Sequence, residues 1–441
     1  MITNGLLGGA RLDRAAGGRV SPLARVRNAA RRDILSLSAV AAICSLPLLR
    51  PAGPSNTALP DATLIGFLLL TIVWAAARGL PMRMPYVFPI GLSLIAAGLA
   101  GLAVGDADFV NMLKDILVFG WAIVIVNHGR TLKLYSVMVK AWVWSSLFYG
   151  AMLVAGVVLG IDALAGRTVL EGERAGGTFG DANYASNYFL ISIFILRATQ
   201  IPRNRWINWA ACAGLAAAIF FTGSNGALLA LVVAGVLGAM FYLIRSGRTA
   251  AGIAGASLVT VVAGTVIGFV DTDAVIRDVS QMHPMLRDSI GRQVAAGDTG
   301  SADSRAKIFA QNMELWLYHD TPFGHGAART EQVLKDMNAE YPKEAHNDYV
   351  AALIERGVLG AVAVVFLCWT LLVHARRIAR SGVLKPGFAQ ILPRPELLGA
   401  AVIAVLISGL FYEVLHYRHV WAFFGLLAAA DVWGRKSEVE L

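Results

Sequence analysis

The stretch PYVFPIGLSLIAAGLAGLAV, residues 85–104, contains no charged side chain. A helix needs about 20 consecutive apolar residues to cross the hydrocarbon core of a bilayer. The stretches at 62–77 and 226–244 are also apolar and uncharged, and they approach the same length. These three stretches predict helices that span a membrane.

The composition of the whole chain agrees with this prediction. The 441 residues are 56% apolar and 15% charged, with a mean hydropathy of +0.61. Soluble domains are also about half apolar, but about a quarter of their residues are charged. The deficit of charge therefore indicates an all-α polytopic membrane protein. The cysteines, Cys44, Cys212 and Cys368, fall inside apolar stretches and imply no disulfide framework.

We expect about twelve transmembrane helices, because apolar segments alternate with short polar connections along the chain. The expected spans are 34–49, 62–78, 85–104, 112–127, 134–160, 183–199, 206–222, 226–244, 250–270, 347–373, 396–412 and 419–433.

Basic residues lie in alternate connections between these spans, and the positive-inside rule then places both termini in the cytoplasm. The same rule explains the net charge of +9 without a nucleic-acid partner. We expect a basic cytoplasmic segment at 1–33, a single transmembrane catalytic domain at 34–433 and a cytoplasmic tail at 434–441.

A long extra-cytoplasmic loop, 271–346, is expected between the ninth and tenth spans. Long loops cross the membrane largely regardless of their charge, so its basic residues do not contradict the topology. Residues 303–320 space their apolar side chains as in an amphipathic helix, which would lie on the bilayer or over a cavity. Residues 321–327 contain a proline and two glycines that end this helix.

Three polar patches are expected on the extra-cytoplasmic face. Arg174 lies beside several glycines, and Asp181 or Asn183 can cap the helix that follows. Arg305 lies on the amphipathic helix, and His346 lies at the start of the tenth span. Taken singly, each patch has an ordinary explanation: a glycine-rich connector, an arginine at the lipid headgroups and a polar residue at the interface.

Further ionisable residues follow. Glu355 and Arg356 lie deeper in the tenth span, where they mark a function or a mutual pair. Near the last span, residues 412–421 contain Glu413, His416, Arg418 and His419, among aromatic residues that are common at the membrane interface.

Several arginines and a histidine together suit a substrate with a diphosphate and a hydroxyl group. Arginine binds phosphate oxygens through a bidentate fork, and histidine can accept a proton near neutral pH. Acidic pairs at 106–108 and 271–273 match a short motif that holds a divalent cation in many sugar transferases. Such tripeptides are common, and no His or Cys spacing indicates zinc, so no metal is expected.

Several motifs resemble the O-antigen ligase and O-antigen polymerase superfamily. The run AHNDYVAALIERGVLG, residues 345–360, resembles its signature of His-Asn followed by Tyr, Glu and two glycines. The run RAGGTFGDANYAS, residues 174–186, resembles its Arg-x-x-Gly-Thr-Phe-x-x-x-Asn element. Segments 221–231 and 316–326 resemble two further elements, and the similarity covers roughly residues 60–430.

The resemblance implies a GT-C glycosyltransferase in the bacterial inner membrane, with an active site that faces the periplasm. Such enzymes move a glycan from undecaprenyl diphosphate to a hydroxyl group, and the ligases use a sugar of lipid A–core as acceptor. They are thought to need no metal or other cofactor and to invert the anomeric centre. His346 matches the family histidine, the general base, while Arg174 and Arg305 match positions that hold the diphosphate.

The chain departs from the family at one motif. Ser224, Asn225 and Gly226 stand where the family has Ser-Arg-Gly, so Arg418 is a candidate to replace the missing arginine at the diphosphate. Supporting or substrate contacts are expected from the other motif residues: Asn183, Ser224, Asn225, Asn347, Tyr349 and Glu355, with Glu355 bracing the helix or Arg356.

Other functions remain open beside a ligase. A polymerase would join the glycan to a second lipid-linked glycan, and a protein O-oligosaccharyltransferase would join it to a protein. From a different class, a transporter would move a lipid or solute. The large basic loop favours a phosphorylated acceptor such as lipid A–core, and therefore a ligase.

Overall fold

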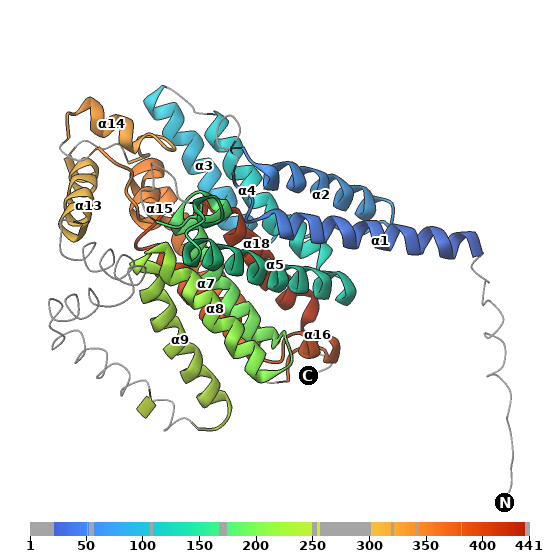
Figure 1. Cartoon of the computed structure of the whole chain (residues 1–441). Helices are drawn as coiled ribbons and strands as arrows, with labels where there is room; N and C mark the ends of the chain where they lie inside the picture. Colours follow the sequence, from blue (N-terminus) through green and yellow to red (C-terminus); the bar gives the residue numbers. More distant parts are fainter. Residues whose placement is uncertain are drawn as a thin grey trace, which may run out of the picture.

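The computed structural model of the chain describes residues 22–50, 52, 57–105, 109–166, 174–248, 254–255, 301–318, 322–339, 342–380 and 382–436. In these residues the chain forms helices joined by turns and loops, with one isolated bridge between Leu384 and Arg435. The protein is therefore all-helical in the part that the structure describes (Figure 1).

The predicted spans coincide with helices, except for 250–270, which lies outside the described residues apart from 254–255. The long helices are α1 (Pro22–Ser45), α2 (Leu59–Ala76), α3 (Val87–Val104), α4 (Phe109–His128), α5 (Leu132–Val158), α7 (Ala182–Thr199), α8 (Arg205–Thr222), α9 (Asn225–Arg245), α15 (Asp348–Ala379), α17 (Glu396–Ser408) and α18 (Arg418–Gly434).

The shorter elements lie in the connections. They are α6 (Asp162–Ala165), η2 (Gly177–Phe179), α13 (Ser301–Tyr318), α14 (Thr330–Asp336), α16 (Pro386–Ile391) and η3 (Val414–His416). The amphipathic helix predicted at 303–320 is α13.

Several helix ends differ from the predicted boundaries, most of all in α1, α15 and α17, and α15 continues to Ala379 beyond the predicted residue 373. Helix α1 begins at Pro22 and not at residue 34, because the alanines and arginines before the apolar segment are good helix formers. Helix α17 ends at Ser408 and not at residue 412. The chain turns there, and the carbonyl of Gly409 accepts a hydrogen bond from the N–H of Asp348.

Among the described residues, five helices are long and apolar enough to cross a membrane, by length and composition: α2, α3, α5, α9 and α15. Large apolar side chains on them point outward. On α3, Leu102 is 77% exposed, and on α15, Val365 and Trp369 are 66% and 67% exposed. A soluble monomer rarely exposes such surfaces, whereas a lipid environment favours them. The protein is therefore a multi-pass membrane protein.

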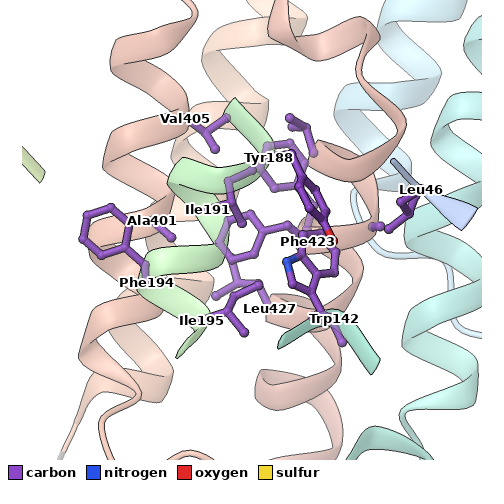
Figure 2. Packing of buried hydrophobic residues seen from close by; sticks show 14 of the residues in the cluster. Leu46, Trp142, Tyr188, Ile191, Phe194, Ile195, Ala401, Val405, Phe423 and Leu427 are labelled. Carbon is purple, nitrogen blue, oxygen red and sulfur yellow. The ribbon is translucent and has the colours of Figure 1, made fainter. Parts of the chain in front are cut away.

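Helices α7 and α18 form the centre of the bundle, because nearly all of their side chains are buried. A helix that is apolar on all sides belongs in the interior. Figure 2 shows Tyr188 and Ile191 of α7 packed against Phe423 and Leu427 of α18, with Trp142 of α5 beside them.

Several polar side chains inside this centre are joined by hydrogen bonds. The indole N–H of Trp142 donates to the Ser192 hydroxyl at 2.9 Å, and the Tyr188 hydroxyl donates to that of Ser145 at 3.3 Å. The Nε2 of His419 lies 3.1 Å from the Asn187 side-chain oxygen. Such bonds offset the cost of burying polar groups and fix the rotation of the helices.

Helix α15 is interrupted at Gly357, where the backbone has φ 64° and ψ −165°. Only glycine populates this region readily. The interruption frees the carbonyls of Ile354 and Glu355 from their intrahelical partners. In a membrane such groups need partners within the protein.

The loop at 322–326 supplies these partners. The N–H groups of His325 and Gly326 donate to the carbonyls of Ile354 and Glu355 at 2.9 and 3.0 Å. In return, the Val358 N–H donates to the carbonyl of Pro322 at 3.2 Å. The loop can approach this closely because residue 324 is glycine. A Cβ at this position would lie 2.5 Å from the Gly357 nitrogen.

Helices α13 and α14 cover the first turns of α15, beside which they lie in Figure 1. Leu315 of α13 and Leu334 of α14 are 1% exposed and pack against Val350 and Ile354 of α15. The amphipathic face of α13 therefore packs on protein at this point.

We expect Gly357→Ala to lower the stability of the protein strongly. The added Cβ would lie 2.2 Å from the carbonyl oxygen of Pro322, and the backbone strain alone costs about 1–3 kcal/mol. The measurement is the melting temperature of the purified protein in detergent. Gly235→Ala in α9 is the control, because its Cβ would meet nothing within 4 Å. An unchanged melting temperature in Gly357→Ala would contradict this account.

Candidate functional site

A polar cavity of about 370 Å³ lies where the start of α15 meets the ends of α2, α4 and α7 and the loop before α18. We call it the polar cavity. It is lined by Thr57, Asp61, Lys114, Asp115, Leu117, Val118, Asp181, Asn183, Tyr184, Ala327, Ala328, Glu344, His346, Glu355, Arg356, Tyr412, Glu413, His416, Tyr417 and Arg418.

The start of α15 places His346 on the cavity wall. Asn347 is the N-cap of the helix, and its side-chain oxygen accepts the N–H groups of Tyr349 and Val350 at 2.9 and 3.1 Å. The residue before this cap, His346, has φ 48° and its side chain is exposed. A left-handed backbone is uncommon for residues other than glycine, although histidine tolerates it better than most.

Asp348 attaches the loop before α18 to this helix start. Its carboxylate accepts the N–H groups of Val414 and Leu415 at 3.0 and 3.1 Å. The Asn347 amide also donates to the carbonyl of Leu410 at 3.1 Å. The loop at 409–417 is therefore held against the first turn of α15.

Glu413, on this loop, lies next to His346 and His416. Its Oε1 accepts the backbone N–H of His346 at 3.2 Å, and its Oε2 lies 3.6 Å from Nε2 of His416. Burial raises the pKa of Glu413 well above its ordinary value, and the carboxylates of Glu355, Glu344 and Asp348 raise it further. The surrounding protein lowers the pKa of His416 by desolvation, although Asp115 opposes this effect.

Two ion pairs join distant parts of the chain at the cavity. Arg356 donates to the Asp115 carboxylate at 2.6 Å and also to the Ser93 hydroxyl. Arg418 makes a bidentate pair with Asp61, at 2.7 and 2.6 Å. Both pairs are largely buried, with side-chain exposures between 10% and 15%. Breaking either pair would leave a charge in a poorly hydrated place.

Arg174 lies at the edge of the cavity and is held by two acceptors. It donates to the side-chain oxygen of Asn183 at 2.7 Å and to the carbonyl of Thr222 at 3.1 Å. Asp181 caps α7 through the N–H groups of Asn183 and Tyr184, as the sequence predicts. The guanidinium of Arg174 is thus fixed beside a residue that lines the cavity.

Carboxylates outnumber cations among the described lining residues. The acidic residues are Asp61, Asp115, Asp181, Glu344, Glu355 and Glu413, and the basic ones are Lys114, Arg356 and Arg418. Two of these cations are already paired with lining carboxylates. An anionic group would therefore need further cations at the edge of the cavity, where Arg174 lies.

Within the described ranges, no cluster of side chains is suited to bind a metal ion. No three His, Cys, Asp or Glu side chains there are arranged to hold an ion. The acidic pairs at 106–108 and 271–273 lie outside the described residues.

The structure brings together many of the residues that the sequence singled out. Those that line the polar cavity are His346, Asn183, Glu355 and Arg418. Those that contact a lining residue or the loop before α18 are Arg174, Asn347 and Ser224, whose hydroxyl donates to that of Tyr412 at 3.4 Å.

Other predicted residues lie elsewhere. The Tyr349 hydroxyl donates to the carbonyl of Leu406 at 2.8 Å, away from the cavity lining. Asn225 is exposed at the start of α9 and is not among the lining residues. The backbone of Arg305 belongs to α13, but its side chain lies outside the described part of the chain. Arg356, expected to mark a function or to pair with Glu355, forms an ion pair with Asp115.

Sequence reasoning missed Asp61, Lys114, Asp115 and Glu344. Lys114 and Asp115 are ionisable residues inside an apolar segment, and this signal marks a function or a buried partner. It also missed the aromatic pair of Tyr184 and Tyr417, whose rings are stacked with centroids 3.6 Å apart on the cavity wall.

Comparison with known proteins agrees with the motifs. Residues 210–365 match the model of a family described as O-antigen ligase. The matched stretch includes most of α8, all of α9, and His346 with the first half of α15. No curated protein matches the chain. The match confirms the family resemblance over residues 210–365.

We expect Asp115→Ala to lower the free energy of unfolding by about 3–5 kcal/mol, because it leaves the buried guanidinium of Arg356 without its carboxylate. Replacing both residues, Asp115→Leu with Arg356→Met, should lower it less. The measurement is a denaturant titration in detergent. Glu331→Ala breaks the exposed pair with Lys335 and should change the value by about 0–1 kcal/mol. Equal effects of the buried and exposed changes would contradict this expectation.

We expect Glu413→Gln to stabilise the protein increasingly as the pH rises. A raised pKa means that the stability linked to Glu413 is present below its ordinary pKa of about 4.5 and is lost as the pH rises through the raised value. A glutamine side chain does not titrate, so residue 413 contributes no such pH dependence to the stability of the variant. The measurement is the difference in melting temperature between variant and wild type at pH 5 and pH 8. A difference that does not grow with pH would contradict the assigned direction.

Proposed function

We propose that the chain is a ligase of the O-antigen ligase/polymerase family, a family of lipid-linked glycan transferases whose model matches residues 210–365. It transfers a glycan from undecaprenyl diphosphate to a hydroxyl group of lipid A–core at the periplasmic face of the inner membrane. The observation that supports this best is the polar cavity, in which His346 meets residues from five distant parts of the chain.

His346 acts as the general base. An imidazole ordinarily titrates near pH 6.5, so its neutral form can take the proton of the acceptor hydroxyl as the new bond forms. The left-handed backbone and the adjacent Asn347 cap support this role, because they present residue 346 at the cavity from a fixed helix end.

Arg174, Arg305 and Arg418 hold the diphosphate. Negative charge grows on the leaving phosphate as the glycosidic bond breaks, and one fixed donor at such a place changes the rate by about 10²–10³. Arg174 is fixed by Asn183 and Thr222. Arg418 is already paired with Asp61, so a phosphate oxygen there must share or replace that carboxylate. Ser224, Asn225, Asn347, Tyr349 and Glu355 support the site or contact substrate.

The reaction needs no metal and inverts the anomeric centre. A single displacement places the base and the leaving group on opposite sides of the sugar. The glycan–diphosphate bond supplies the driving force, because the periplasm has no nucleotide-sugar supply. We assign the chain twelve spans of the GT-C type with both termini in the cytoplasm, an arrangement supported by the alternation of basic connections.

A deletion strain of the source bacterium supplies the substrates for the test. It should accumulate lipid-linked polymer and bare lipid A–core, and both can be extracted and mixed with the purified protein. We expect wild type to transfer glycan to the core with or without EDTA. We expect His346→Ala to lower the rate at least about 10²-fold, because general-base catalysis contributes 10²–10⁴. The transferred glycan is measured on a lipopolysaccharide gel.

His325→Ala is the control, because His325 does not line the cavity and contributes its backbone N–H to the contact with α15. Loss of transfer in the presence of EDTA would contradict the metal-free mechanism and indicate that the reaction needs a metal ion. Extension of the lipid-linked glycan without transfer to the core would identify a polymerase, and glycan on a protein would identify a protein transferase. A changed flux across vesicles with intact transfer in His346→Ala would favour a transporter.

A further inference from the structure

The backbone of His346 is in an unfavourable conformation that something must maintain. Its φ of 48° lies in the left-handed region, and residue 346 directly precedes the Asn347 cap of α15. Strained residues persist only where their surroundings determine them. The N–H of residue 346 donates to the carboxylate of Glu413, 67 residues later in the chain, at 3.2 Å.

We propose that Glu413 is a positioning residue for His346: its carboxyl group holds the N–H of residue 346, and so orients the imidazole toward the polar cavity. This inference rests on the proposed role of His346 as the base. Glu413 does not touch the reacting atoms in this scheme. It acts through the backbone of its neighbour.

Both the backbone next to Glu413 and its side chain are held in place. The loop before α18 is attached to α15 through the Asp348 carboxylate, which binds the N–H groups of Val414 and Leu415. The Glu413 side chain is 12% exposed, and its second oxygen lies 3.6 Å from His416. His416 in turn lies 3.8 Å from Asp115. The carboxyl group therefore has little freedom to move away from residue 346.

The charged groups around Glu413 favour its neutral form. Glu344, Asp348 and Glu355 are carboxyl groups that face it, and burial raises its pKa well above the ordinary value. The neighbouring His416 is within electrostatic reach of Asp115, Arg356, Lys114 and Glu344. A neutral carboxyl group still accepts an N–H through its carbonyl oxygen. Glutamine has the same shape and the same acceptor, so it can replace Glu413 in a positioning role.

The test compares Glu413→Gln, Glu413→Ala and Glu331→Ala in the full-length protein. The assay uses lipid-linked polymer and lipid A–core from the deletion strain, over a range of substrate concentrations and pH. Glu331 is the matched control, because it lies on α14, is exposed and pairs with Lys335 outside the cavity. Melting temperatures report whether each variant is folded.

We expect Glu413→Gln to keep kcat within about threefold of wild type, with the same pH profile. We expect Glu413→Ala to lower kcat by about 10- to 100-fold with KM within about twofold, because a displacement of about 1 Å in a catalytic group can lower the rate by about 10²-fold. Glu331→Ala should behave as wild type.

Provided that the wild-type protein is active in the assay, two results would overturn the inference. If Glu413→Gln is as impaired as Glu413→Ala or shifts the pH profile, Glu413 exchanges a proton and is not a positioning residue. If a folded Glu413→Ala keeps the wild-type kcat, residue 346 needs no support from Glu413. Absence of transfer by wild type itself would instead overturn the proposed function.

Discussion

The structure depends on the pairing of backbone groups at the interruption of α15. Carbonyl groups that lose their helical partners in a membrane need other donors, and the loop at 322–326 supplies two N–H groups. This contact draws the segment between α13 and α14 onto α15, the helix whose N-cap directly follows His346. The polar cavity lies directly beside it, because Glu355 and Arg356, at the interruption, are part of its lining.

The loop before α18 completes the arrangement from the other side. The Asp348 carboxylate accepts hydrogen bonds from two backbone N–H groups of this loop, and the Asn347 amide donates to one of its carbonyls. The start of α15 is thus enclosed by one loop that precedes it in the chain and one that follows it. Rigid placement of this kind suits a catalytic group, whose geometry must be kept within a fraction of an ångström.

Hydropathy was sufficient to predict most of the helices, because each apolar segment satisfies its own backbone bonds and needs no distant partner. The capping of α7 by Asp181 followed from local chemistry in the same way. The pairs of Arg356 with Asp115 and of Arg418 with Asp61 could not be predicted, because 241 and 357 residues separate the partners in sequence. The interruption at Gly357 was also missed, since a single glycine in an apolar segment is compatible with an unbroken helix.

The loop at 409–418 has a consequence for biogenesis. It contributes Tyr412, Glu413, His416, Tyr417 and Arg418 to the cavity wall, and it precedes only the last long helix of the described chain. During synthesis these residues therefore leave the ribosome after His346 and α15. A nascent chain that has not yet inserted this loop lacks a large part of the wall. Assembly of the site thus follows synthesis and insertion of this loop.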